Sequence, residues 1–317
     1  MIYLDNAAST PIHKDVLTEM LPFLAEQYGN PSSIHKLGRT ANKAIQNARK
    51  QIANLINAQA DEIFFTSGGT ESNNITLYGF AYAKKGNHVI TSSIEHEAVL
   101  EPCKRLEKDG LSVTYLPVSS DGLVDPMDVK NAITKDTCLV SIMFANNEVG
   151  TVQPIKDISK ICKEKQIPFH SDAVQAVGKM PIDIKDLELS AMSISSHKLN
   201  GPKGIGALYI KKGIKIEPLI LGGGQENGIR SGTENVASIV GFGKACELAK
   251  ENLQKNIVHL KSLRDSLVSK ITSEISHVSF NGNREKRIPN NAHFTFLGVN
   301  GEDLIIKLDE NEIAAST

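Results

Sequence analysis

Polar side chains that could do chemistry follow apolar, strand-like runs at five places in this sequence. The five clusters occupy residues 66–71, 95–96, 146–148, 170–175 and 195–198. In open parallel sheets, ligands bind beyond the carboxyl ends of the strands. Five such clusters on one sheet edge would form a binding site.

The first cluster, Thr66-Ser67-Gly68-Gly69-Thr70, is a glycine-rich turn between a predicted strand and a predicted helix. The glycines let the backbone approach a ligand, and a helix N-terminus offers unpaired N–H groups and a positive dipole end. This combination suits a phosphate group. The turn lacks the signatures of P-loops and dinucleotide folds, which disfavours nucleoside triphosphates and NAD. A purely structural turn is the alternative.

Asp172 and Lys198 each follow an apolar run. A carboxylate at the floor of a cleft is costly unless a cation pairs with it; the alternative for Asp172 is a helix N-cap. Lys198 follows Ser-Ser-His and precedes the rigid turn Asn200-Gly201-Pro202. The alternative for Lys198 is an ordinary solvated lysine.

A phosphate-binding turn, a carboxylate and a lysine together match what pyridoxal 5'-phosphate (PLP) requires. Lys198 would form the Schiff base, and Asp172 would keep the pyridine nitrogen protonated. His96 could stack on the ring and handle protons, because imidazole titrates near neutral pH. Either Gln175 or Asn147 would hydrogen-bond the phenolic oxygen.

Alternating strand-like and helical segments must position these clusters. Helices are expected at residues 13–28 and 40–58, after residue 71 and from residue 155. Strands are expected at residues 62–66, 88–91, 111–116, 138–144, 168–170, 191–195 and 205–210. This alternation predicts an α/β fold with a mostly parallel central sheet and helices on both faces.

The C-terminal part has a different pattern. A long helix, broken once, is expected over residues 233–275, followed by strands at 278–280 and 292–297 and a helix at 301–309. These elements indicate a smaller α/β domain that is incomplete. We therefore expect an N-terminal segment (1–12) that packs with the small domain, a large cofactor-binding domain (13–250) and a partial small domain (251–317).

Bulk properties exclude several classes of protein. The 317 residues carry 35 basic and 36 acidic side chains, which disfavours nucleic acid as a partner. The longest apolar stretch is far shorter than the roughly 20 residues of a membrane span, and the N-terminus lacks the features of a secretory signal. The four cysteines are far apart, have no histidine at metal-ligand spacing, and predict reduced, buried thiols. We expect a cytoplasmic protein that contacts neither membrane nor nucleic acid.

With these residues identified, the chain resembles the cysteine desulfurases, in the class-V aminotransferase group of fold-type I PLP enzymes. The resemblance spans essentially the whole chain. Its ordered motifs lie at residues 3–11, 29–33, 66–74, 146–150, 170–175, 195–198, 201–204, 222–226 and 230–235. It implies conversion of L-cysteine to L-alanine, with the sulfur passed as a persulfide toward iron–sulfur clusters or thiolated tRNA through an acceptor or scaffold protein.

The resemblance also implies a role for each matching residue. Lys198 looks like the Schiff-base lysine, Asp172 like the partner of the pyridine nitrogen, and Gln175 like the partner of the phenolic oxygen. His96 would stack on the ring as acid and base, and Asn147 would contact the cofactor and the substrate carboxylate side. The phosphate ligands would be Gly69, Thr70, Ser195 and His197. Thr233 would reach the phosphate of a neighbouring subunit, which implies a homodimer with shared sites.

Two departures from the family pattern stand out. Asn227 occupies a position where many members have arginine. The sequence ends at Ala-Ala-Ser-Thr, residues 314–317, where the family continues to its nucleophilic cysteine and a substrate-binding arginine. We therefore expect this chain, as it stands, to bind PLP without releasing sulfur. A selenocysteine lyase, another class-V lyase and a non-catalytic PLP-binding subunit are the alternatives.

Overall fold

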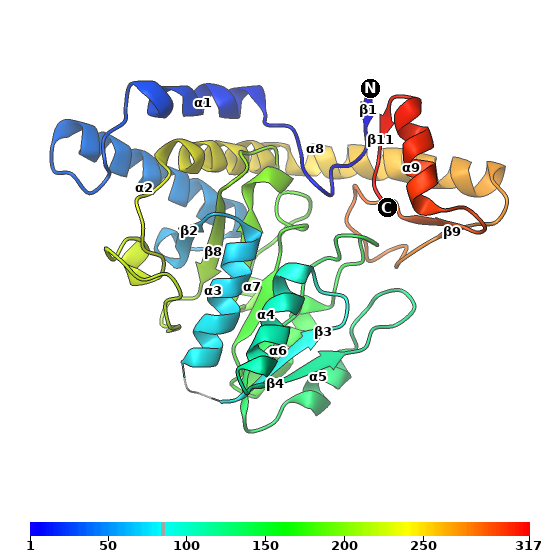
Figure 1. The fold of residues 1–317 in the computed structure, drawn as a ribbon, viewed down its shortest axis with the longest axis horizontal. Coiled ribbons are helices and arrows are strands. Elements are labelled where there is room, and N and C mark those ends of the chain that lie inside the picture. The colour runs from blue at the N-terminus through cyan, green and yellow to red at the C-terminus, as the bar shows by residue number, and fades with distance from the viewer. Residues whose placement is uncertain (84–85) are drawn as a thin grey trace.

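The computed structural model describes residues 1–83 and 86–317. Within these ranges a seven-stranded sheet forms the centre of the molecule, in the order β2-β8-β7-β6-β5-β3-β4 (Figure 1). The strands are β2 (Ile63–Thr66), β3 (His88–Ser92), β4 (Ser112–Leu116), β5 (Thr137–Ser141), β6 (Phe169–Asp172), β7 (Ala191–Ser195) and β8 (Gly206–Ile210). Strand β8 runs antiparallel to β2 and β7, and the remaining pairs are parallel. The predicted mostly parallel sheet is confirmed.

Helices cover both faces of this sheet, as predicted. One face carries α3 (Gly69–Tyr82) and α4 (Glu97–Lys108). The other carries α2 (Lys36–Ile56), α5 (Pro126–Ala132), α6 (Ile155–Glu164), α7 (Ile184–Leu187) and α8 (Val236–Glu274). Successive side chains of a strand point to opposite faces, so Phe64 packs in the core beneath α3 and α4 while Phe65 packs in the opposite core.

Helix α8 is continuous over 39 residues, so the predicted break is wrong. Its glycines serve close packing against α2 and α1 (Lys14–Ala25). A Cβ on Gly241 would lie 2.5 Å from Met20 Sδ, and a Cβ on Gly243 would lie 2.6 Å from Ala48 Cα. Helix α8 therefore runs alongside both helices without a kink.

A group of short strands and one helix lies at the C-terminal end of α8 (Figure 1). Strand β9 (Val278–Phe280) pairs antiparallel with β10 (Phe294–Phe296), and α9 (Gly301–Glu310) follows. Strand β1 (Ile2–Tyr3) pairs in parallel with β11 (Ile313–Ala314), so the two ends of the chain lie side by side. The domain boundary expected at residue 250 falls inside α8.

Helix α4, which the sequence analysis did not predict, contains Pro102 and begins immediately after His96. Helix α1 ends at Ala25, three residues before its predicted end, and α2 begins at Lys36, four residues earlier than predicted. No helix in the described ranges combines the length and apolar character needed to cross a membrane.

Candidate active site

The five polar clusters meet at one edge of the sheet. Thr66 and Ser195 both pair with Gly206, and Asp172 pairs with Ser193. Backbone pairing continues past the end of β5, where Phe144 N donates to Asp172 O at 2.8 Å. The Asn146 side chain then donates to Ile94 O at 2.9 Å and joins the loops that follow β5 and β3.

Asp172, the last residue of β6, carries a buried carboxyl group. Its Oδ2 accepts a 2.6 Å hydrogen bond from Asn73 Nδ2, and its Oδ1 accepts one from Val174 N at 3.0 Å. Burial raises the pKa of this carboxyl, while the hydrogen bonds and the charges of His96 and Lys198 oppose that rise. The contact with Val174 shows that Asp172 also caps the turn that follows, but no helix begins there, so the helix N-cap alternative is wrong.

Lys198 lies in the short 3-10 helix η2 (Ser196–Lys198) that follows β7, and its side chain is half-buried. Its Nζ donates to the carbonyl oxygens of Ala7 and Ala8, the latter at 2.9 Å. Burial lowers the pKa of this amine, against the opposing charges of Asp5 and Asp172. A lysine with a lowered pKa has more free amine available to react with a carbonyl.

The N-terminal segment covers this lysine. Thr10 donates twice to His197 O, through its backbone N at 2.9 Å and its hydroxyl at 2.8 Å, and Ser9 Oγ lies 3.3 Å from His197 Nδ1. The motif at residues 3–11 is evident in the sequence, but its contribution to the site is not. That contribution is made by the carbonyls of Ala7 and Ala8, which have no signature in side-chain chemistry.

The start of α3 holds the residues predicted to bind a phosphate. A Cβ on Gly69 would lie 2.6 Å from Val174 Cγ2 and 3.8 Å from Ser195 Cβ, so only glycine fits without displacing a neighbour. The first N–H groups of the helix, at Gly69 and Thr70, have no intrahelical acceptor. His197 lies two residues after Ser195, and burial, followed by the charges of Lys198, Lys203 and Lys179, lowers its pKa to about 4.

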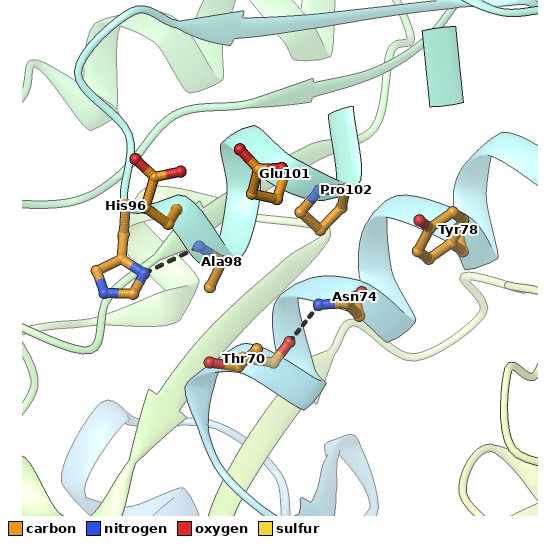
Figure 2. A pocket seen from close by; sticks show the side chains of 8 residues that line it. Thr70, Asn74, Tyr78, His96, Ala98, Glu101 and Pro102 are labelled. Carbon is orange, nitrogen blue, oxygen red and sulfur yellow. Dashed lines mark hydrogen bonds between the residues drawn. The ribbon is translucent and has the colours of Figure 1, made fainter. Parts of the chain in front are cut away.

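His96 caps α4, and its Nδ1 accepts a 3.0 Å hydrogen bond from Ala98 N. Figure 2 shows His96 and Thr70 at the N-terminal ends of α4 and α3, where both line a cavity of about 430 Å³. Because Nδ1 accepts, the neutral ring carries its proton on Nε2. Nε2 is then the atom through which His96 can exchange a proton with a ligand.

The remaining predicted residues occupy different positions. Gln175 is buried, and its Nε2 donates to Ala7 O at 3.0 Å, beside Lys198. Asn147 lies partly buried on the turn after β5. Thr233 is exposed ahead of α8, and its reach to a neighbouring subunit stays a prediction.

Three polar residues near the site have no role assigned from the sequence, although Glu95 and Asn73 lie within recognised motifs. Asn73 is 99 positions from its partner Asp172. Glu95 is fully buried, and its Oε1 accepts from Ser92 Oγ at 2.6 Å and from Met143 N at 2.8 Å. Lys179 is buried against Gln175. A position in or beside a recognised motif says nothing about burial.

These residues fit PLP. A buried carboxylate suits a protonated ring nitrogen, a half-buried amine suits an aldehyde, and a glycine-lined helix N-terminus suits a phosphate. In the described parts of the chain, no group of three or more His, Cys, Asp or Glu side chains is arranged to hold a metal ion.

Comparison with known proteins agrees with this chemistry. The family model described as aminotransferase class-V matches residues 2–317. Cysteine desulfurase IscS of Dictyoglomus turgidum is 55% identical over 318 residues, covering 100% of this chain and 81% of the relative. A solved NifS-like protein superposes with a TM-score of 0.97 at 43% identity, covering 100% of this chain and 87% of that one. The structure of SspA in complex with cysteine gives a TM-score of 0.87 at 39% identity, covering 100% and 89%.

The family match covers nearly the whole chain, and the curated relative is 55% identical over the full length of this chain. The chain therefore belongs to the aminotransferase class-V family and, within it, to the PLP-dependent cysteine desulfurases.

Proposed function

We propose that this protein binds PLP at the sheet edge described above and uses it to remove the sulfur of L-cysteine, leaving L-alanine. The observation that carries the proposal is the convergence of the Lys198 amine, the buried Asp172 carboxylate and the N-terminus of α3. The bound cysteine of the SspA structure supports the choice of substrate.

PLP, when bound, supplies an aldehyde that takes an amine covalently and a ring that accepts an electron pair. Lys198 would offer the amine, and Asp172 would hold the proton on the ring nitrogen. Gln175 would donate to the phenolic oxygen. The phosphate would be held by Gly69, Thr70, Ser195 and His197.

His96 is the residue proposed to stack on the cofactor and move a proton during the reaction. Its Nδ1 is occupied by Ala98 N, so Nε2 is the working atom and the ring orientation is fixed by the start of α4. Asn147, on the turn after β5, is proposed to contact the cofactor and the carboxylate side of the substrate.

None of the four cysteines is placed to receive the sulfur. Cys103, Cys138, Cys162 and Cys246 are all buried. Burial raises the pKa of each thiol, to about 12 for Cys103 and Cys162. A buried, protonated thiol is a poor nucleophile. This observation favours a second candidate function for residues 1–317 by themselves, in which they bind PLP and cysteine without releasing sulfur.

The proposal extends to partners. Thr233, exposed ahead of α8, would complete the phosphate site of a second copy in a homodimer. The sulfur would pass to an acceptor protein or an iron–sulfur scaffold in the cytoplasm. Analytical ultracentrifugation of the protein with PLP would test the dimer, and a monomer with a full cofactor complement would contradict it.

The central test is spectroscopic. We expect added PLP to give a protein-bound absorbance band that is absent in Lys198→Ala and that changes when L-cysteine is added. For residues 1–317 by themselves, whose four thiols are all buried, we expect alanine and sulfide to stay near background. A bound band that persists in Lys198→Ala would refute the site. Rapid sulfide release would show that one of the four buried thiols becomes accessible.

A further inference from the structure

Lys179 is a buried lysine for which the proposed mechanism has no use. It lies seven residues after the end of β6, and its side chain is 8% exposed. Across residues 1–83 and 86–317, no carboxylate forms an ion pair with it. Lysines are rarely buried without an anionic partner, because removing the charge from water is costly.

The hydrogen bonds of Lys179 lead toward the cofactor site. Its Nζ donates to Gln175 Oε1 at 2.8 Å, and Gln175 Nε2 donates to Ala7 O at 3.0 Å. The same Ala7 carbonyl accepts from Lys198 Nζ. The two lysines are therefore joined through the side-chain amide of Gln175 and one backbone oxygen.

This arrangement fixes the orientation of the Gln175 amide. A protonated amine has only donors, whereas an amide has an acceptor oxygen on one side and a donor NH2 on the other. With Oε1 held by Lys179, Nε2 must face Ala7 and Lys198. Burial, followed by the positive charge of Lys198, lowers the pKa of Lys179 to about 7, in keeping with the proximity of the two amines.

We propose that Lys179 is a positioning residue for the cofactor: it holds Gln175 so that the Nε2 donor, and not the oxygen, faces the phenolic oxygen of PLP. This inference rests on the proposed PLP site. Without Lys179 the amide can rotate and turn its oxygen toward the anionic phenolate, which would repel it.

The test uses the PLP-loaded protein and two readouts, the dissociation constant of PLP and the pH midpoint of the bound-cofactor absorbance change. Lys179→Met removes the donor at similar volume, and Lys179→Arg keeps a donor. Lys185→Met, on the exposed surface six residues further along, is the matched control. For Lys179→Met we expect a PLP dissociation constant raised about tenfold, as for one lost hydrogen bond, and a midpoint raised by roughly one pH unit.

A purely structural role would lower the melting temperature without moving these readouts. If Lys179 acts through Gln175, the double variant Lys179→Met/Gln175→Leu should bind PLP within about twofold of Gln175→Leu alone. Lys179→Arg should bind within about threefold of the wild type. Should Lys179→Met fail to fold, Lys179→Gln, one atom too short to reach Gln175, should show the same two shifts.

Wild-type values in Lys179→Met, or fully additive effects in the double variant, would overturn the inference. Failure of the proposed PLP site is distinguishable, because the wild-type protein itself would then show no bound-cofactor band that depends on Lys198.

Discussion

The side-chain amide of Asn73 donates a 2.6 Å hydrogen bond to the carboxylate of Asp172 inside the protein, where Asn73 is fully buried and Asp172 is 6% exposed. Asn73 lies on the second turn of α3, the helix whose first turn is the proposed phosphate cradle. One helix thus shapes both ends of the proposed cofactor site. The hydrogen bond stabilises the charged form of Asp172 against the effect of burial, which raises its pKa.

Replacing Asn73 should destabilise the charged form of Asp172. For Asn73→Ala we expect PLP affinity to fall by about tenfold, because the neutral form of Asp172 no longer pairs with a protonated ring nitrogen and a hydrogen bond to a charged group contributes roughly 1.5 kcal/mol or more. Equilibrium titration followed by absorbance measures this. Asn54→Ala, the same change at an exposed position of α2, is the control. Equal affinities for both variants would contradict the role given to Asn73.

The raised pKa of Glu95 leads us to expect that the stability of the folded protein depends on pH. Burial raises its pKa from 4.5 to about 8. Between these pH values the folded chain keeps a proton that the unfolded chain has lost. The stability that Glu95 contributes is therefore full below about pH 4.5 and is lost as the pH rises through about 8.

Glu95→Gln removes this titration while keeping the shape of the side chain. We expect the melting temperature of Glu95→Gln, relative to the wild type, to be higher at pH 8 than at pH 5. Glu97→Gln, at an exposed neighbouring position, should show no such trend. A difference that is constant or reversed between the two pH values would show that Glu95 is ionised in the folded protein.

Substituting Gly69 tests whether close packing at the start of α3 is needed for the proposed phosphate site. A methyl group there would lie 2.6 Å from Val174 Cγ2, so Gly69→Ala should lower the free energy of unfolding by roughly 1–3 kcal/mol. Because the displaced groups surround the cradle, PLP affinity should fall by at least about tenfold. Adding Val174→Ala makes room for the methyl group, and the double variant should recover most of both losses. No recovery would mean that the backbone of Gly69 matters for another reason.

A buried ion pair anchors the loop that leads toward Thr233. Arg49 and Glu226 form two 2.7 Å hydrogen bonds, and Glu226 also accepts from Phe65 N at 2.9 Å. Their side chains are 12% and 4% exposed. Because the change leaves an unpaired buried guanidinium, Glu226→Ala should lower the free energy of unfolding by about 3 kcal/mol.

Glu101→Ala provides the comparison, because it breaks an exposed pair with Lys104 and should cost less than about 1 kcal/mol. Chemical denaturation measures both variants. Similar costs for the two changes would show that the Arg49–Glu226 pair is not effectively buried.

The sequence predicted the central sheet well, because five of its seven strands are short apolar runs followed by a polar cluster at one edge. Strands β7, β8 and β9 lie within one residue of their predicted ends. Helix α4 was missed, although His96 depends on it for its orientation, because Pro102 interrupts an otherwise helical pattern. The pairing of β1 with β11 involves two residues at each end of the chain and has no periodic pattern to recognise.

The sequence singles out the charged residues and the glycine turn of the proposed site, but it does not reveal the residues that hydrogen-bond to them. Lys198, Asp172 and Gly69 stand in motifs whose chemistry can be read locally. The contacts of Asn73 with Asp172, and of Lys198 with Ala7, join positions 99 and 191 residues apart. The burial of Lys179 likewise depends on packing between distant segments. Such partners follow from the tertiary fold, which local patterns do not specify.

The most direct test of the account is to locate the covalent attachment of PLP. The loaded protein would be reduced with borohydride, digested, and analysed by mass spectrometry to find the modified lysine. Among the residues that the structure describes, Lys179 is the second lysine whose pKa is lowered by burial, and it is an internal competitor. We predict a single pyridoxyl group on Lys198. Modification of Lys179, or scattered modification of exposed lysines, would contradict the assignment of the site.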